Sequence, residues 1–496
     1  MPLPNRSLRR LAAAAASVVA LGACTTVGPN FKTPDAPKGA AAAGYVMAGD
    51  RVPAGVRLDP ASRAAGPWWN AFGSPDLDRV IRGALADSPT LAEANATLQK
   101  AQADAAAARG AQAPQAGASG SVQRERINTQ AFGFTGFPSP TIGLYSIGAT
   151  VDYDLDLFGG RRRASEQAQA QADAAARQAD AAYLSLTGNV AIHAMRVAGL
   201  RAQIAAVQAV IADDHRAAEM VARAQAAGGE APAATDSVQA QLAEDEALLP
   251  PLERDLALAR HQLALLSGKS PAEWTAPDFD LAALTAPAEI PVSLPSGLVR
   301  QRPDILAAEA ELHAATAAIG VAVAAQYPDL SLSANLTQAA IKPEQIFNYG
   351  SSGWSLLAGL TAPIFDGGVR KAHRQAAEAE ARASLARYQQ TVLRAFVQVS
   401  DVLASLGADQ RQVAAETRAR DAAQKAVANA QSAYRLGGGT LMDLVDAQRQ
   451  LSRARRGLAQ AQGQAFEDRV QLYAATATDW GAARGPQLAE ASSSSR

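Results

Sequence analysis

Apolar and polar residues alternate along four segments of about ten residues each, a period typical of β-strands with two different faces. The clearest segment is 141–158, where tyrosine, isoleucine, valine and leucine occupy the apolar side of the pattern. Its polar side ends in three carboxylates, Asp152, Asp154 and Asp156. The other segments are 117–127, 329–337 and 353–365. Short segments with this period indicate transmembrane β-strands, which present one face to lipid and the other to a water-filled lumen.

A soluble sheet is the alternative, because a sheet that packs one face on a core alternates in the same way. Membrane strands are favoured, since the chain offers no other apolar sheet to cover these segments. The three carboxylates alone suggest calcium, but alternating aspartates on one strand more simply line a wet lumen. Four strands cannot close a barrel, and an open edge in lipid leaves backbone groups without hydrogen-bond partners. The sequence therefore predicts oligomerisation without fixing the number of protomers.

Two long proline-free segments follow the strands, and their composition favours helix throughout. Residues 161–227 correspond to a helix of roughly 100 Å at 1.5 Å per residue, and residues 369–436 are of similar length. Each ends at a glycine turn and continues into a returning helix, which predicts coiled-coil hairpins at about 161–266 and 369–475. We expect the pair Pro250–Pro251 to bend or break the first returning helix. The turn glycines are Gly228, Gly229, Gly437, Gly438 and Gly439.

The chain contains this arrangement twice. A shift of 214 residues places Pro89 on Pro303, and a shift of 208 places Gly159 on Gly367. Each copy is too large for a solenoid repeat. We expect a signal peptide at 1–23, an N-terminal lipid-anchored segment at 24–74, repeats at 75–268 and 303–476, a linker at 269–302 and a tail at 477–496. The linker and the N-terminal segment are expected to form an equatorial collar around the hairpins.

The first residues have the pattern of an export signal. Three arginines precede an apolar stretch from Leu11 to Leu21, which is too short to span a bilayer as a mature helix. Leu-Gly-Ala-Cys then ends at Cys24 and resembles a lipoprotein signal-peptidase site. A secretory signal with an incidental cysteine is the alternative. Because Cys24 has no second cysteine to pair with and Thr25 follows it instead of aspartate, we expect a lipidated N-terminus directed to the outer membrane.

Composition narrows the functional classes. The net charge is −1 and aromatic residues make up 5%, which gives no sign of nucleic-acid binding and suits thin helix packing. No run of 18 consecutive apolar residues follows the signal, so any membrane crossing falls to the strands. The sequence has no phosphate-binding loop, zinc-protease motif or cysteine–histidine cluster, and its carboxylates show no isolated buried pair. We therefore expect neither an enzyme nor a bound metal or cofactor.

Several motifs resemble those of the TolC/OprM/NodT family of outer-membrane efflux channels, in its lipidated branch. They are CTTVGPNFKTP, RPDILAAEAELHAA, YPDLSLSANL, IFDGGVR and YRLGGGTLMDLVDAQRQL. The resemblance implies an α+β membrane protein in the outer membrane, with a homotrimeric twelve-stranded barrel on a helical tunnel through the periplasm. It also implies passive export of drugs or other small molecules, with a periplasmic adaptor protein and an inner-membrane pump of the resistance–nodulation–division type as partners. The alternative is an adaptor-like coiled-coil lipoprotein, which would lack lipid-facing strands.

In that family the periplasmic tip is a closed iris held by polar contacts. The resemblance places this gate at Tyr434, Asp443 and Asp446, with Thr235 and Asp236 in the first hairpin. Asp443 and Asp446 share a helix face, so threefold symmetry would gather six carboxylates that favour cations. The alternative is that both only cap and solvate the helix start. Some members have a basic residue where this chain has Gly439, so that salt bridge is missing here.

Both long helices begin with basic residues, although cations at a helix start oppose the macrodipole. We interpret these residues as contacts to lipid phosphates of the inner leaflet, with a solvated helix face as the alternative. They are Arg161, Arg162, Arg163, Arg370, Lys371 and Arg374.

Overall fold

The computed structural model describes residues 26–35, 45, 56–58, 67–133, 135–136, 138–287, 290–292 and 295–476. The expected anchor Cys24, the signal segment and the C-terminal tail lie outside these residues. The chain forms two compact units. The first contains residues 97–175 and 307–388 with the N-terminal segment up to Pro34, and the second contains residues 35–96, 176–306 and 389–496.

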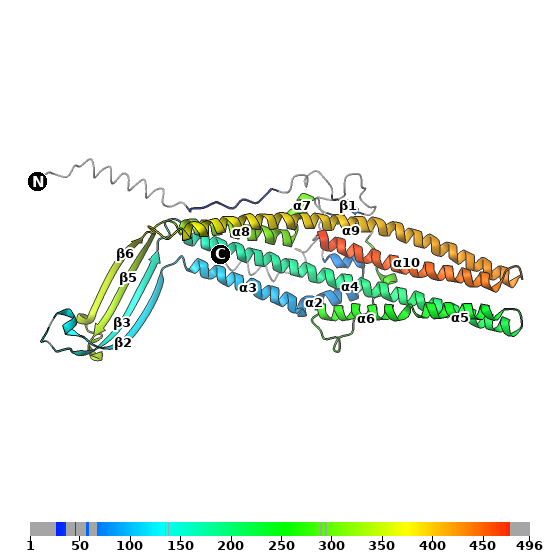
Figure 1. Ribbon diagram of the computed structural model, residues 1–496, viewed down its shortest axis with the longest axis horizontal. Helices are drawn as coiled ribbons and strands as arrows, with labels where there is room; N and C mark the ends of the chain where they lie inside the picture. The colour runs from blue at the N-terminus through cyan, green and yellow to red at the C-terminus, as the bar shows by residue number, and fades with distance from the viewer. Residues whose placement is uncertain are drawn as a thin grey trace. The chain divides into compact units, whose positions relative to one another are not determined.

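The first unit contains a four-stranded antiparallel sheet in the order β2-β3-β5-β6, which Figure 1 shows side by side. The strands are β2 (Gln115–Arg126), β3 (Thr141–Asp154), β5 (Asp329–Ala340) and β6 (Ser352–Thr361). All four overlap the segments with alternating pattern, although β2 begins two residues earlier and β5 ends three residues later than expected. However, β3 stops at Asp154 instead of residue 158, because the chain turns there with a positive φ of 46° at Asp156.

The sheet has one polar and one apolar face. On the polar face Asp152 lies opposite Gln115 on one neighbouring strand and Ser333 on the other. On the apolar face Val151 lies opposite Ala334. This face is exposed in the single chain, most strongly on β6 at Trp354 (77%), Leu356 (75%) and Leu360 (67%). Within the described residues β2 and β6 each pair along one side only, so the sheet keeps two open edges.

The second unit contains both helical hairpins, which end in tight turns (Figure 1). Helices α4 (Gly160–Ala226) and α9 (Val369–Arg435) have 67 residues each and continue from the first unit into the second. α4 returns through α5 (Pro232–Glu246) and α6 (Leu249–Leu266), whereas α9 returns through α10 (Leu441–Thr476). The interruption between α5 and α6 falls at the expected proline pair, since proline lacks the N–H that a continuous helix needs.

Shorter helices precede each pair of strands, and two short strands pair with each other. The helices α2 (Pro75–Asp87) and α3 (Pro89–Gly110) precede the first pair of strands, and α7 (Pro295–Gln301) and α8 (Pro303–Ala324) precede the second. Strand β1 (Val56–Leu58) pairs in parallel with β4 (Ile290–Val292). The segment before the first repeat therefore shares a small sheet with the segment between the repeats, as a mixed collar requires.

The core of the second unit combines an aromatic cluster with thin helix packing. Trp68 and Phe72 are buried, and Trp68 stacks on Tyr473 with ring centroids 5.5 Å apart. Farther along, α4 and α10 approach so closely that a Cβ added at Gly463 would lie 3.0 Å from the Cα of Gly199. Small residues at such crossings let the backbones approach, in agreement with the alanine-rich composition.

Three helices of the described residues are long and apolar enough to cross a membrane by length and composition, namely α4, α8 and α9. Their apolar windows have a mean hydropathy of 1.2 to 1.3 and are 33–56% buried. Counting consecutive apolar residues missed them, because alanine-rich windows reach this hydropathy although polar residues interrupt them. The expectation that any membrane crossing falls to the strands therefore does not follow from length and composition alone.

Candidate functional site

Both hairpins end in the same glycine turn, a Schellman motif. The first glycine of each turn has a positive φ, 74° at Gly228 and 71° at Gly437, which a residue with a side chain rarely adopts. Gly439 follows the second turn, and a Cβ there would lie 3.0 Å from the Cβ of Ala433, which leaves little room for a larger residue. The backbone hydrogen bonds run from Gly228 to Gln225, Gly229 to Ala224, Gly437 to Tyr434 and Gly438 to Ala433, at 2.9–3.1 Å.

A capping box begins α10 at the second tip. The backbone N–H and the hydroxyl of Thr440 donate to the Asp443 carboxylate at 2.9 and 2.7 Å, and the N–H of Asp443 donates back to Thr440 Oγ1 at 3.1 Å. The hydrogen bonds from the Thr440 side chain and backbone lower the pKa of Asp443 below its usual value. In the single chain Asp443 therefore caps the helix. The equivalent helix of the first hairpin begins instead with Ala231 and Pro232.

The other residues expected at the gate lie near the two turns. Tyr434 is 38% exposed in the last turn of α9. Asp446 forms an ion pair with Arg449 at 3.3 Å. The Thr235 hydroxyl donates to a glutamine side chain of α4, and Asp236 is exposed. Among the contacts of the described residues, none joins these gate residues to one another.

An apolar cluster holds the two tips of one chain together. Val221 of α4 and Val238 of α5 are buried and pack with Leu441, Leu444 and Val445 at the start of α10. Movement of one tip away from the other has to expose these side chains to water, which opposes separation. The candidate gate aspartates therefore stand on a helix start that is fastened to the neighbouring hairpin.

Two buried carboxyl pairs lie inside the hairpins, which corrects the expectation of no such pair. Asp214 of α4 lies beside Asp245 of α5, and Asp409 of α9 lies beside Asp468 of α10. Burial raises the pKa of Asp214 and of Asp409 to about 7, and the partner carboxylate adds to the increase. Arg449 beside the first pair and an arginine beside the second oppose it. Asp214 and Asp409 therefore keep their protons up to about neutral pH.

The two pairs lie at different positions along the duplicated hairpin. A shift of 209 residues superposes the start of α4 on the start of α9. At this shift each aspartate pair falls on two buried apolar residues of the other repeat. Asp214 and Asp245 correspond to Ala423 and Ala454, and Asp409 and Asp468 correspond to Leu200 and Ala259. Both pairs could have been found in the sequence by placing each outgoing helix beside its returning helix, with the glycine turn between them.

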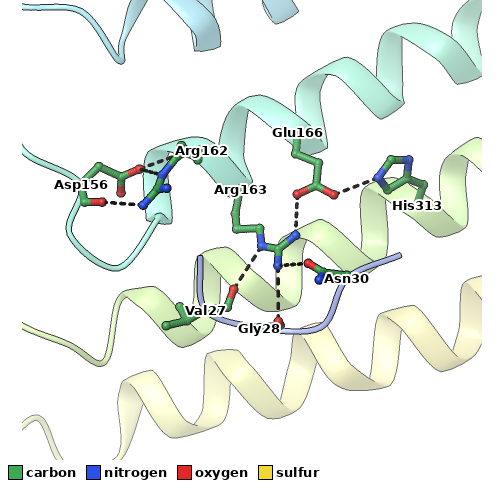
Figure 2. A network of polar contacts seen from close by, with 8 residues as sticks. All are labelled: Val27, Gly28, Asn30, Asp156, Arg162, Arg163, Glu166 and His313. Atoms are coloured by element: carbon green, nitrogen blue, oxygen red, sulfur yellow. Dashed lines mark hydrogen bonds and ion pairs between the residues drawn. The ribbon is translucent and has the colours of Figure 1, made fainter. Parts of the chain in front are cut away.

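The three aspartates expected to line a lumen have different positions. Asp152 and Asp154 lie on the polar face of β3, but Asp156 lies beyond the strand. Its carboxylate accepts the backbone N–H groups of Arg161 and Arg162 at 2.9 and 3.0 Å and also pairs with the Arg162 side chain (Figure 2). Asp156 therefore does not belong to the strand, and it satisfies free N–H groups that begin α4.

The five arginines at the starts of α4 and α9 have protein partners, which explains their position without lipid, whereas Lys371 is exposed. Asp366 caps α9 as Asp156 caps α4, accepting backbone N–H groups of Gly368 and Arg370 at 2.9 and 3.1 Å. These hydrogen bonds lower the pKa of Asp366. The ion pairs are Arg161 with Asp154, Arg162 with Asp156, Arg163 with Glu166, Arg370 with Asp366 and Arg374 with Glu378.

Known proteins resemble this chain over most of its length. A family model described as "Outer membrane efflux protein" matches residues 80–269 and 294–478. The chain is 31% identical to the pyoverdine export outer membrane protein OpmQ of Pseudomonas putida, over 86% of this chain and 92% of that protein. It is 27% identical to the probable outer membrane lipoprotein SilC of Salmonella typhimurium, over 83% and 88%. The solved outer-membrane channel OprN matches with a TM-score of 0.81 and 28% identity, covering 92% of this chain and all of that chain.

Proposed function

This chain belongs to the outer membrane efflux protein family and is an outer-membrane channel component of efflux, and we propose that three copies of it form one continuous tube. The two-faced sheet with its open edges carries this proposal. Three sheets joined edge to edge close a twelve-stranded barrel, which satisfies the edge N–H and C=O groups in lipid and places the apolar face outward. On the inner face Asp152 and Asp154 line the water-filled lumen.

The tube conducts its cargo passively and performs no catalysis of its own. A periplasmic adaptor protein and an inner-membrane pump of the resistance–nodulation–division type deliver drugs or other small molecules to its periplasmic end. A lipid on Cys24 adds a second attachment to the outer membrane. An adaptor-like lipoprotein is the less suitable interpretation. A soluble hairpin protein would leave the apolar face of the four-stranded sheet exposed to water.

Reconstitution tests the channel itself. The purified protein should give single-channel currents in planar bilayers, and a Cys24→Ser variant should still need detergent, because the strands remain. A Cys24→Ser protein that is soluble and monomeric without detergent would contradict the barrel. Mass spectrometry of the mature protein tests the lipid independently of this result.

The periplasmic gate is formed by the tip of the second hairpin. Asp443 and Asp446 are three residues apart on α10 and therefore share a face. Asp446 is 60% exposed, and the Asp443 carboxylate is also at the surface. Three copies around one axis bring six carboxylates together, which attracts cations and excludes anions. Tyr434, Thr235 and Asp236 lie on the same two tips and complete the latch.

Removing the two charges tests this gate. Asparagine caps a helix about as well as aspartate does, so Asp443→Asn with Asp446→Asn removes charge while keeping the helix start. We expect a higher single-channel conductance and a weaker preference for cations. Thr440→Ala is the matched control, because it weakens the cap but keeps both carboxylates. If the double variant conducts like the parent, the gate assignment is wrong.

A further inference from the structure

Arg163, in the first turn of α4, is buried to 3% exposure and binds the N-terminal segment. Its guanidinium donates to the backbone carbonyl of Val27 at 3.1 Å, to that of Gly28 at 3.4 Å and to Asn30 Oδ1 at 2.7 Å (Figure 2). A guanidinium removed from water needs all its hydrogen bonds satisfied, and three of these acceptors belong to residues 27–30. Of the three arginines at the start of α4, Arg163 thus hydrogen-bonds to the N-terminal segment.

Glu166 and His313 complete the site around this arginine. The Arg163 guanidinium also donates to Glu166 at 2.6 Å, and His313 Nε2 lies 3.0 Å from the other carboxylate oxygen of Glu166 (Figure 2). Burial alone would raise the pKa of Glu166, but hydrogen bonds from His313 and Arg163 lower it. The His313 ring stacks on Phe31 at 4.4 Å between centroids. We call Arg163, Glu166 and His313 the cradle.

Glycines let the backbone of the segment lie directly against its neighbours. A Cβ added at Gly28 would lie 2.5 Å from the Cα of Gly320 in α8. A Cβ added at Gly159 would lie 2.6 Å from the side chain of Thr26. The backbone N–H of Val27 also donates to the carbonyl of Phe158 at 3.1 Å. Contacts of this closeness require a bound segment, whereas a flexible tether would not need them.

We propose that residues 26–33 form a strap that docks in the cradle and fastens the start of α4, in the first repeat, to α8, in the second. The side chain of Thr33 extends the contact by donating to Glu309 of α8 at 2.8 Å. Because Cys24 stands two residues before Thr26, the strap also fixes the anchor where β3 passes into α4. This last part rests on the proposed lipidation. The docking itself depends on Arg163.

Amide hydrogen exchange of the full-length protein in detergent tests the strap. The Val27 amide should exchange slowly in the parent, and Arg163→Ala should accelerate it on the order of tenfold or more. Lys371→Ala is the matched control, since Lys371 is the exposed residue that corresponds to Arg163 at a shift of 208. Asn30→Ala acts from the strap side and leaves α4 intact, and it should give a smaller acceleration. Unchanged Val27 exchange in both the Arg163 and Asn30 variants would overturn the proposal.

A Cys24→Ser variant separates the strap from the lipid. We expect Val27 to stay protected in this variant, because the cradle and not the acyl chain holds the segment. Loss of protection in Cys24→Ser, with Arg163 intact, would overturn the proposal by showing that the lipid positions the segment. A mature protein without fatty acid on Cys24 would refute lipidation alone, and slow Val27 exchange in that protein would still support the strap.

Discussion

Replacing Asp409 by asparagine should stabilise the channel protein at pH 8, and should stabilise it less at pH 5. Asp409 is 7% exposed and lies beside Asp468 across the second hairpin. The charged groups near it are the Asp468 carboxylate, the Arg469 guanidinium and Asp280, which lines the same cavity of about 620 Å³. Asparagine has the shape of the protonated acid and cannot ionise.

The magnitude follows from the displaced pKa. Burial moves the pKa of Asp409 from 3.8 to about 7, so the folded chain binds a proton that the unfolded chain has released. Stability therefore falls as the pH rises from about 4 to about 7 and stays low above that range. At 1.36 kcal/mol per pKa unit the full shift is about 4 kcal/mol. Since residual contact with solvent screens part of this cost, we expect a gain of about 2 kcal/mol for Asp409→Asn at pH 8.

Thermal unfolding in detergent at a fixed scan rate is the assay. We expect the midpoint of Asp409→Asn to exceed that of the parent by roughly 2–4 °C at pH 8, and by about a third of this difference at pH 5. Asp401→Asn is the control, because Asp401 is an exposed aspartate on the same helix. An equal difference from the parent at both pH values would refute the reasoning, because the cost of keeping Asp409 protonated in the folded chain grows between pH 5 and pH 7.

Three further predictions follow from the helical hairpins. Asp214→Asn should reproduce this pH dependence in the first hairpin, measured by the same thermal scans. Thr440→Ala should destabilise the protein by about 1 kcal/mol through loss of the capping box, a loss that Thr440→Ser should largely avoid. Gly463→Val should lower the unfolding midpoint strongly, because its side chain would meet Gly199 where α4 and α10 touch, and an unchanged midpoint would exclude that contact.

The features that could be predicted from the sequence are those that depend on residues close together in the chain. A period of two marks a strand with two faces, and the glycine turns and Pro250 mark where a helix reverses or breaks. The end of β3 could not be predicted in this way. Asp156 continues the alternation of the strand, although its carboxylate accepts a backbone hydrogen bond from the first turn of α4. Apolar patterning cannot distinguish a last strand residue from a first capping residue when both are aspartate.

The buried pairs and the strap could not be predicted in this way, because each depends on residues far apart in the chain. Asp409 and Asp468 are 59 residues apart, and each looks like an ordinary surface carboxylate in its own helix. Arg163 follows two other arginines that pair locally, so its sequence context gives no reason to single it out. Only its hydrogen bonds to Val27 and Asn30, in the segment before the first repeat, distinguish it.

The two open edges of the sheet have a consequence for how the channel is made. A lone chain in a bilayer would leave the outer strands without partners, so the inserted form has no stable monomer to accumulate first. Folding of the barrel and association of the chains are then a single step, whose equilibrium depends on the concentration of chains near the membrane. Lowering the expression of the protein should therefore reduce the inserted fraction itself, and not only the total amount.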